Sequence, residues 1–364
     1  MLMRLASIFL ALLSASFTAH GQSAYFPEKH EWQSKQAEQL GFNKSALNDA
    51  VSFAQSNEYS GSRDLRIAIF DGFKREPFHE ILGPTKKRGG PAGMILKDGY
   101  IAAQWGDLER VDMTFSVTKS FLSTLAGLAQ DQGLIYSVND KVANYVWDDT
   151  FRGEHNQKIT WHSLLNQSSD WSGELFGIKD WADRPPQEGG IDDWKYRVLN
   201  APDTVMEYND VRVNVLAYSL LQVFRQPLPQ VLKTQIMDKI GASSTWRWFG
   251  YEDAWVTIDG LKMKSVTGGG HSGGGVFINT LDQARFGLLV LNNGRWKNEQ
   301  IISKQWLDSA IEPSKANASY GYMWWLNKGP RKWDEVEDSD MFYAAGFGGN
   351  FIVVDRKNNM VIVT

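Results

Sequence analysis

Apolar residues at strand spacing are concentrated near the two ends of the chain. The apolar stretch 91–105 is interrupted by Lys97-Asp98-Gly99, and Asp-Gly between two such runs is a strong hairpin signal. Near the end, the stretch 351–364 is interrupted by the polar Lys357-Asn358-Asn359, which predicts a second hairpin. Two further stretches predict single strands: 64–70, which is closed by Asp71-Gly72, and 273–278.

Between these ends, apolar residues recur at helical spacing. The clearest case begins at Ser116, and Gly133 follows it as a stop signal. Thr280-Leu281-Asp282-Gln283 has the pattern of a capping box that opens another helix. The predicted helices are 38–58, 116–130, 161–167, 213–224, 228–240 and 280–291, and the stretch 134–232 is expected to be mainly helical.

Strands, then helices, then strands predict an α+β fold. We expect an antiparallel sheet assembled from both ends of the chain and flanked by helices, with a large helical insertion. The expected unit is a single domain over 22–364, in which 22–115 and 265–364 form the α/β part and 116–264 the helical part.

The first residues are typical of a secretory signal peptide. One positive charge precedes an apolar run over 5–19, and Ala19-His20-Gly21 resembles a cleavage site before Gln22. The run is shorter than the roughly 20 residues needed to span a bilayer. We therefore expect the signal peptide 1–21 to be removed and the mature protein to be periplasmic or secreted, without membrane association. The alternative is that the segment is retained as an N-terminal anchor.

Composition narrows the classes of partner. The 364 residues are 43% hydrophobic and 22% charged, which excludes a disordered or coiled-coil chain. The absence of Cys excludes structural zinc held by thiolates. A net charge of −4 without a basic block gives no support for a nucleic-acid partner, so a small-molecule substrate is expected and no cofactor. The 15 Trp indicate either an aromatic-lined cleft or a bulky core. The oligomeric state stays open.

Candidate chemistry begins with Ser116-Val117-Thr118-Lys119, an S-x-x-K pattern at the start of a predicted helix. Residues three apart lie on one helix face, so the Ser116 hydroxyl and the Lys119 ammonium can meet. A serine becomes a nucleophile only when a neighbour helps to remove its proton. The free N–H groups of a first helical turn also stabilise an oxyanion. The alternative is a plain N-cap serine followed by a solvated lysine.

Two later segments carry further candidates. Tyr208-Asn209-Asp210 lies at the entrance of the predicted helix 213–224. A tyrosine acts as a general base only where nearby cations stabilise its phenolate, and Lys119 could supply that charge. The alternative is a half-buried aromatic followed by an N-cap aspartate. The second segment is the glycine-rich run 344–349, whose backbone could pass close to a ligand or form a simple bulge.

In this order, the three elements resemble the serine β-lactamase and penicillin-binding-protein superfamily, closest to its class C branch of esterases and 6-aminohexanoate-dimer hydrolases. S-x-x-K resembles the first family motif, Tyr208-Asn209-Asp210 falls on Y-x-N, and Ala344-Ala345-Gly346 falls on K-T-G. The resemblance covers about 43–364 and implies the β-lactamase/transpeptidase-like fold. It also implies an acyl-enzyme on Ser116, activated by Lys119 and Tyr208.

The same resemblance implies further roles. The backbone N–H groups of Ser116 and Phe347 would form the oxyanion hole. The expected substrate-binding residues are Asp210, Gly346, Gly348 and Trp171. Whether Lys119 or Tyr208 is the base stays open.

Two departures from the family motifs bear on the substrate. Ala344 and Ala345 stand where the family has the Lys and Thr that hold a substrate carboxylate. Asp210 replaces an Asn, and an ionised Asp beside Lys119 favours the ammonium form and shifts the role of base toward Tyr208. Both departures favour an ester or linear amide without that carboxylate. A β-lactamase or D-Ala-D-Ala peptidase and a catalytically idle sensor are the alternatives.

Three histidines, His155, His162 and His271, have no acidic residue at metal-ligand spacing, so no metal site is predicted. His271 could line the cleft or pack in its turn. The Trp324-Trp325 pair and Trp171 could shape a pocket or belong to the core. Because family members usually continue with a helix after the last strand, the sequence leaves open whether the chain is C-terminally truncated at Thr364.

Overall fold

The computed structural model describes residues 24–329, 333 and 341–364, and the predicted signal segment lies outside them. Within the described residues, the largest sheet is antiparallel, with strand order β12-β13-β14-β15-β1-β2. Met94 of β1 pairs with Val363 of β15, so the two ends of the chain meet in the middle of this sheet. The strands are β1 Gly93–Lys97, β2 Tyr100–Trp105, β12 Trp325–Leu326, β13 Met341–Gly346, β14 Asn350–Asp355 and β15 Met360–Val363. The α+β fold and both predicted hairpins are confirmed.

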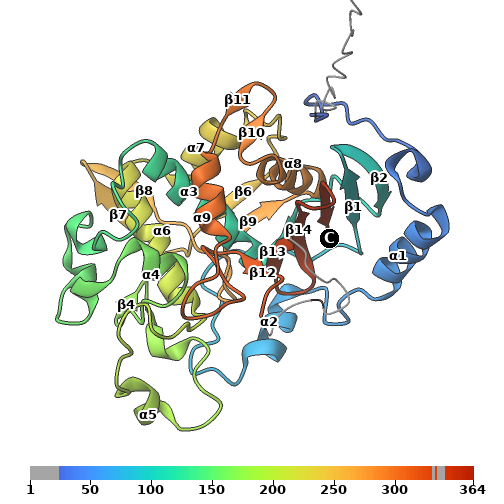
Figure 1. Cartoon of the computed structure of the whole chain (residues 1–364). Helices are drawn as coiled ribbons and strands as arrows, with labels where there is room; N and C mark the ends of the chain where they lie inside the picture. The colour runs from blue at the N-terminus through green and yellow to red at the C-terminus, as the bar shows by residue number, and fades with distance from the viewer. Residues whose placement is uncertain (1–23, 330–332, 334–340) are drawn as a thin grey trace, which may run out of the picture.

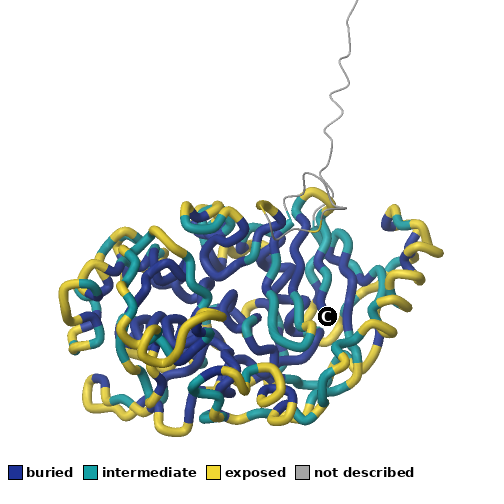
Figure 2. Tube along the Cα trace, turned by 90° about the horizontal axis from the view of Figure 1, so that it is seen from below, coloured by how far each residue is buried: buried dark blue, intermediate teal, exposed yellow. Residues whose placement is uncertain are grey.

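The large sheet lies on the right side of Figure 1, and helices α8 and α1 pack against it. Helix α8 (Thr280–Leu291) packs on β14 and β15, where a Cβ at Gly287 would lie 2.6 Å from Val361. Helix α1 (Lys44–Ser56) packs beside β2 and is largely exposed along its outer face (Figure 2). The predicted helix 280–291 is confirmed. Its N-cap is Asn279 rather than Thr280, because the Asn279 side chain accepts a hydrogen bond from the Asp282 N–H.

A second sheet connects the large sheet to the helical part of the molecule. Its order is β3-β9-β6, formed by Asp112–Met113, Gly275–Ile278 and Arg247–Phe249. The buried helix α3 (Thr118–Asp131) follows β3 and contacts α6 (Asp210–Phe224). In Figure 1, α3, α4, α6 and α7 lie together on the left. Figure 2 shows that the residues at the centre of the molecule are mostly buried.

The stretch 134–232 is less helical than predicted. Apart from α6 its α-helices are single turns, and much of it is irregular or 3₁₀ in form. The predicted helix 228–240 is a short α-helix that continues as a π-helix and ends in a turn. The remaining helices are α4 Trp161–Leu165, α5 Ile191–Lys195, α7 Leu228–Leu232 with π-helical Lys233–Met237, and α9 Lys304–Ala310. Short hairpins are β4 Glu174–Leu175 with β5 Ile178–Lys179, β7 Trp255–Ile258 with β8 Leu261–Lys264, and β10 Arg295–Trp296 with β11 Glu299–Gln300. The 3₁₀ turns are Ala37–Leu40, Phe115–Val117, Val142–Asn144, Asp149–Phe151, Asn156–Lys158 and Asp180–Ala182.

The predicted strand 64–70 is wrong, because this segment begins helix α2 (Leu65–Phe73). The Asp64 carboxylate caps the helix by accepting a hydrogen bond from the Arg66 N–H. Leu65, Ala68 and Ile69 are buried, which is the i, i+3, i+4 spacing of a helix face. The apolar residues of 64–70 fit both the alternation of a strand and the spacing of a helix face, and packing against the core selected the helix.

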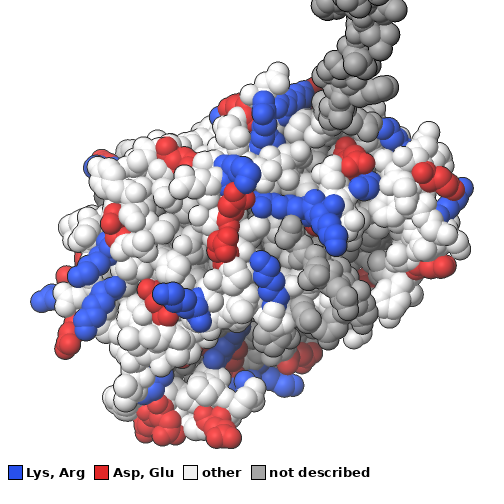
Figure 3. Space-filling model, viewed as in Figure 1, with Lys and Arg blue, Asp and Glu red and all other residues white. Residues whose placement is uncertain are grey.

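Two surface properties complete the description. On the face shown in Figure 3, acidic and basic side chains are interspersed without a large field of one sign. Among the described residues, no helix is long and apolar enough to cross a membrane.

Candidate active site

Ser116 lies in the 3₁₀ turn Phe115–Val117, between β3 and α3. The α-helix begins at Thr118, so Ser116 lies before the helix and not, as the sequence had predicted, at its start. Ser116 is half-buried, whereas its neighbours Phe115 and Val117 are buried. The preceding Phe115 has φ 48°, a left-handed conformation that is strained for an aromatic residue.

The backbone behind this turn explains how the strain is held. Gly269 has φ +77°, and a Cβ there would overlap the carbonyl oxygen of Phe115. A glycine is therefore required for both conformation and close approach. The glycine-rich loop supports the turn that exposes Ser116.

Lys119 extends from the first turn of α3 toward Ser116. Its Nζ lies 2.7 Å from Ser116 Oγ, 2.7 Å from Asp210 Oδ1 and 3.3 Å from the carbonyl oxygen of Gly268. The residue is 1% exposed, and a charge buried to this extent requires paired hydrogen-bonding partners. The alternative of a solvated lysine is thus wrong.

The N-terminus of α6 supplies the counter-charge. Asn209 is the N-cap, and its Oδ1 accepts a hydrogen bond from the Arg212 N–H at 3.0 Å. The Asn209 Nδ2 donates a hydrogen bond to the carbonyl oxygen of Asp180 at 2.7 Å. This bond fixes the loop that follows Asp180. Because Asn209 performs the capping, the Asp210 carboxylate is free to reach Lys119.

Asp210 is buried between cations. Its Oδ2 accepts a hydrogen bond from Arg184 Nη1 at 2.7 Å, on the side opposite Lys119. Burial alone would raise the pKa of the Asp210 carboxyl, but Arg184 and Lys119, together with His271, hold it well below its usual range. The carboxylate is therefore ionised at neutral pH, which the sequence argument had left as a condition, and it forms an ion pair with Lys119.

Tyr208 forms the next wall of the site. Its half-buried ring is stacked on Trp325, with ring centroids 5.7 Å apart. Lys119 Nζ lies 5.0 Å and Arg184 Cζ 5.2 Å from the centroid of the Tyr208 ring. Two cations thus face this tyrosine. A cavity of about 210 Å³ opens beside Tyr208 and Arg184 and is also lined by Trp181 and Trp194.

Strand β13 approaches the same turn from the large sheet. A Cβ at Gly346 would overlap the carbonyl oxygen of Thr114, so this glycine permits close contact with the segment before Ser116. The ring of Phe347 packs edge-on against Phe115, 5.3 Å between centroids. Gly348 follows with φ +84° in the turn to β14. The structure thus brings Gly346 and Phe347 next to the Ser116 turn, whereas the position of a Gly348 Cβ lies nearest to Tyr59 and Asn350.

Trp171 has a different position from the one predicted. It is 3% exposed, and its Nε1 donates a hydrogen bond to the carbonyl oxygen of Thr150 at 2.8 Å. Its expected place among the substrate-binding residues is therefore wrong, because its side chain is packed in the core. Trp324 is likewise buried at 1% exposure, whereas its neighbour Trp325 contacts Tyr208.

Three charged residues near the site were not found by sequence reasoning, namely Glu76, Asp183 and Arg184, whereas His271 was considered as a residue that could line the cleft. No motif marks these three residues, and they come from separate loops. The signal that could have been noticed is the Asp183-Arg184 pair before a Pro-Pro sequence.

Glu76, Asp183 and His271 are the candidate metal ligands in the described part of the chain. Each is buried and offers one ligand atom, and these atoms lie within 4.8 Å of one another. The sequence argument that no acid accompanies His271 is wrong, since the fold supplies two. The other histidines have packing roles: His162 Nδ1 lies 2.6 Å from the Tyr322 hydroxyl, and His155 Nε2 lies 2.9 Å from the carbonyl oxygen of Asp170.

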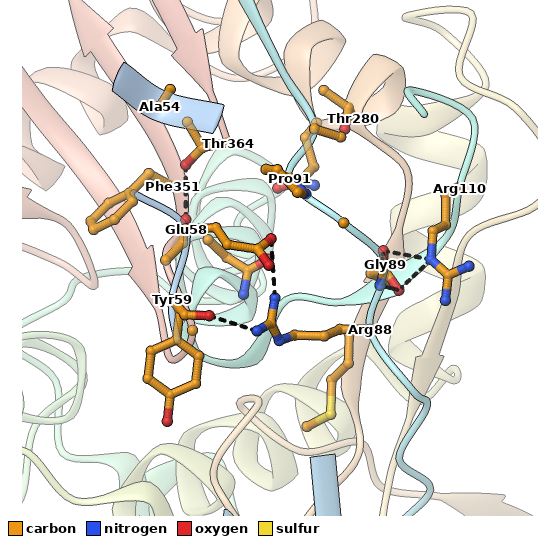
Figure 4. A pocket seen from close by; sticks show the side chains of 18 of the residues that line it. Ala54, Glu58, Tyr59, Arg88, Gly89, Pro91, Arg110, Thr280, Phe351 and Thr364 are labelled. Carbon is orange, nitrogen blue, oxygen red and sulfur yellow. Dashed lines mark hydrogen bonds and ion pairs between the residues drawn. The ribbon is translucent and has the colours of Figure 1, made fainter. Parts of the chain in front are cut away.

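A second cavity, of about 370 Å³, is lined by Phe115 and Phe347. Figure 4 shows other residues that line it, among them Tyr59, Arg88 and Phe351. It separates α1 and its following loop from β3 and the large sheet. Arg88 spans it, donating hydrogen bonds from Nη2 to the carbonyl oxygens of Tyr59 and Gly61 at 2.6 and 2.8 Å. These contacts join the loop that follows α1 to the segment before β1.

The comparisons with known proteins agree with this geometry. The family profile described as Beta-lactamase matches residues 99–364. The chain belongs to the Beta-lactamase family. Members of this family share the β-lactamase/transpeptidase-like fold and are serine hydrolases, and the matched range contains Ser116, Lys119 and Tyr208.

Solved structures resemble most of this chain at low sequence identity. A putative beta-lactamase from Bacteroides dorei DSM 17855 has TM-score 0.57 and 14% identity, covering 88% of this chain and 89% of its own. A family VIII carboxylesterase has TM-score 0.54 and 18% identity, covering 84% and 90%. A putative 6-aminohexanoate-dimer hydrolase from Bacillus anthracis has TM-score 0.51 and 16% identity, covering 75% and 72%. A search of curated proteins gave no significant match.

Proposed function

We propose that this protein is a serine hydrolase that cleaves an ester or a linear amide through an acyl-enzyme on Ser116. The observation that carries the proposal is the contact of Lys119 Nζ with both Ser116 Oγ and Asp210 Oδ1, each at 2.7 Å, in a Beta-lactamase-family chain. A half-exposed serine that receives a hydrogen bond from a buried ammonium is held in one position for attack.

In the first step, Ser116 Oγ forms a bond to the acyl carbon of the substrate. Its proton passes to a base, and the alcohol or amine departs after receiving a proton. Lys119, which is paired with Asp210, orients Ser116 and stabilises negative charge, and we assign the role of base to Tyr208, whose ring faces Lys119 and Arg184. Water, activated by the same tyrosine, then releases the acyl group from Ser116.

The oxyanion of this reaction requires N–H donors beside Ser116. We assign the backbone N–H groups of Ser116 and Phe347 to this role. The close approach of Gly346 to Thr114 supports the assignment, because it sets the end of β13 against the Ser116 turn.

The substrate class follows from what β13 lacks. Ala344 is buried at 1% exposure, and Ala345 follows it, so neither offers a cation or a hydroxyl to a substrate carboxylate. The cavity beside Tyr208 is lined by tryptophan rings and by arginines that are already paired with acids. An uncharged acyl or leaving group suits this surface. The similarity in fold to a carboxylesterase and to a putative 6-aminohexanoate-dimer hydrolase is consistent with such substrates.

The test is the intact mass of the purified protein after brief exposure to a p-nitrophenyl ester, a linear oligoamide or penicillin G. The variant is Ser116→Ala. The matched control is Ser123→Ala, since Ser123 is a buried serine of α3 whose hydroxyl has no hydrogen-bond partner among the described residues.

We expect a transient acyl mass or turnover with the ester or the amide, abolished in Ser116→Ala and retained in Ser123→Ala. Labelling of Ser116 by penicillin alone would establish a β-lactamase or D-Ala-D-Ala peptidase instead. Absence of any labelling or turnover would refute the hydrolase assignment in favour of a ligand-binding homologue. We further propose export directed by the segment 1–21, which N-terminal sequencing of the protein recovered outside the cytoplasm would test.

A further inference from the structure

Arg184 lines the cavity beside Tyr208, and only one of its guanidinium nitrogens is paired within the described part of the chain. Its Nη1 donates to Asp183 Oδ1 and Oδ2 at 3.2 and 3.0 Å and to Asp210 Oδ2 at 2.7 Å. Nε and Nη2 have no hydrogen-bond acceptor among the described residues, and neither atom is sealed from solvent. Because a guanidinium carries five N–H groups, three of them remain free to bind a ligand.

The guanidinium is held in one orientation. Its Cζ lies 5.2 Å from the centroid of the Tyr208 ring and 5.6 Å from that of the Phe73 ring. The backbone of Arg184 has φ 50°, a left-handed conformation that is uncommon for a residue other than glycine. The loop before it is fixed to α6, because Asn209 Nδ2 donates to the carbonyl oxygen of Asp183 at 3.2 Å. Little side-chain entropy is therefore lost when a ligand binds these N–H groups.

The carboxylate of Asp210 connects Arg184 to the nucleophile. One of its oxygens accepts a hydrogen bond from Arg184, and the other accepts one from Lys119 Nζ at 2.7 Å. The same Nζ lies 2.7 Å from Ser116 Oγ. The free N–H groups of Arg184 are thus held at a fixed position relative to the point where a substrate reacts with Ser116.

The charges around Arg184 favour a neutral acceptor. Asp183 and Asp210 are balanced by Arg184 and Lys119. A substrate carboxylate beside Arg184 would also lie close to both aspartates, which repel it, whereas a carbonyl oxygen accepts the same hydrogen bonds without this repulsion. The other charged residues that line the cavity are two acids and two arginines that pair with one another: Asp180, Glu207, Arg197 and Arg212.

We propose that Arg184 is a substrate-binding residue that donates hydrogen bonds from Nε and Nη2 to a second, neutral carbonyl oxygen of the substrate. This inference rests on the proposed hydrolase function, and it narrows the substrate to esters or amides with a further carbonyl group a few bonds from the one that Ser116 attacks. Trp181 and Trp194 line the same cavity and offer apolar surface to the chain between the two carbonyl groups.

The kinetic test uses pairs of esters of matched chain length, with and without an amide carbonyl. For the acyl side, the p-nitrophenyl esters of N-acetyl-β-alanine and N-acetyl-4-aminobutyrate are compared with the hexanoate and the heptanoate. For the leaving-group side, 2-acetamidoethyl acetate is compared with pentyl acetate. The p-nitrophenyl monoester of adipate places a carboxylate where the amide would lie.

A hydrogen bond to a charged donor is worth about 10- to 100-fold in affinity, so we expect kcat/KM to favour the amide member of at least one pair by about this factor. The rates are first divided by those of the uncatalysed hydrolysis, which removes differences in intrinsic reactivity. The adipate monoester should react no faster than the heptanoate. Absence of a preference in every pair, or preference for the adipate monoester, would overturn the proposal.

The variant is Arg184→Lys, which keeps a positive charge between Asp183 and Asp210 but replaces the planar fork by a single ammonium. The readout is the ratio of kcat/KM within a pair, and we expect the variant to bring this ratio close to one. A purely structural role would slow both members of a pair equally and leave the ratio unchanged. The matched control is Arg197→Lys, since Arg197 lines the same cavity but is paired with Asp180. Loss of the preference in the control alone would refute the assignment to Arg184.

A binding measurement distinguishes failure of this proposal from failure of the proposed function. Ser116→Ala cannot form an acyl-enzyme, so titration calorimetry measures its affinity for the same pairs, with methyl in place of p-nitrophenyl, without turnover. We expect tighter binding of the amide member by about 10- to 100-fold, and loss of this difference when Arg184→Lys is added. Equal affinities in every pair would refute the Arg184 site even in an active enzyme. Selective binding by a chain that hydrolyses none of the esters would support the Arg184 site and refute the hydrolase function.

Discussion

Replacing Asp210 by Asn removes the carboxylate that neutralises two buried cations while preserving the shape of the side chain. Lys119 Nζ and Arg184 Nη1 each lie 2.7 Å from one of its oxygens, and Lys119 is almost fully buried. An amide offers one acceptor oxygen and an NH₂ group that cannot face a cation. The variant therefore retains two positive charges without their shared partner.

The size of the effect follows from this geometry. Breaking a buried ion pair by removing one partner costs about 3–5 kcal/mol. At about 2.1 cal/mol/K per residue, roughly 330 ordered residues have an unfolding entropy near 0.7 kcal/mol/K. We therefore expect Asp210→Asn to lower Tm by about 4–7 °C. Because the pKa of Asp210 is held low in the folded protein, its stabilising effect is present above about pH 4 and is lost only as pH falls below that value.

The assay is thermal unfolding at pH 7, with Asp282→Asn as the matched control. Asp282 is also buried, but it accepts hydrogen bonds from the Ser243 N–H at 2.8 Å and hydroxyl at 2.6 Å and has no ion pair within 4 Å among the described residues. Its replacement should cost about 1 kcal/mol, the value of an ordinary hydrogen bond, or about 1–2 °C. Equal losses in the two variants would refute the argument that charge neutralisation holds the site together.

Three further outcomes are expected. Gly269→Ala forces a Cβ onto the Phe115 carbonyl at φ +77°, so it should lower stability by about 1–3 kcal/mol and slow ester hydrolysis; unchanged melting and rate would contradict the strained turn. Asn209→Ala removes both the cap of α6 and the donor to the Asp180 carbonyl, and the urea midpoint should report a loss of about 2 kcal/mol. Burial alone would lower the pKa of His271, but the interaction with Asp210 and the charges of Asp183 and Asp210 raise it above its ordinary value. The stability that His271 contributes should be full below about pH 6.5 and decline as pH rises through its raised folded-state pKa, so the difference in unfolding free energy between wild type and His271→Gln should be larger at pH 6 than at pH 9.

The features determined by the sequence alone are those encoded by neighbouring residues. The hairpin turns at Lys97-Asp98-Gly99 and at Lys357-Asn358-Asn359 form as predicted, because turn residues between apolar runs act locally. The Ser116–Lys119 contact is also local, since it joins residues three apart. The order of the family motifs then placed Tyr208, Asp210 and Gly346 near them, and the structure brings these residues together.

Other features depended on packing between distant segments. The run 64–70 satisfies both strand and helix spacing, and only burial of Leu65, Ala68 and Ile69 against the core selected the helix. Trp171 belongs to the core because Thr150, far from it in the sequence, accepts its N–H. Side-chain type alone does not distinguish a buried tryptophan from one that lines a cleft.

The network around His271 is the clearest product of tertiary structure. Glu76, Asp183, Arg184 and His271 come from three separate loops, and no spacing along the chain relates them. Folding buries Glu76, Asp183 and His271 and leaves Arg184 only partly exposed, so their charges interact more strongly than they would in water. The sequence determined which charged groups exist, whereas the tertiary structure determined which of them share a site.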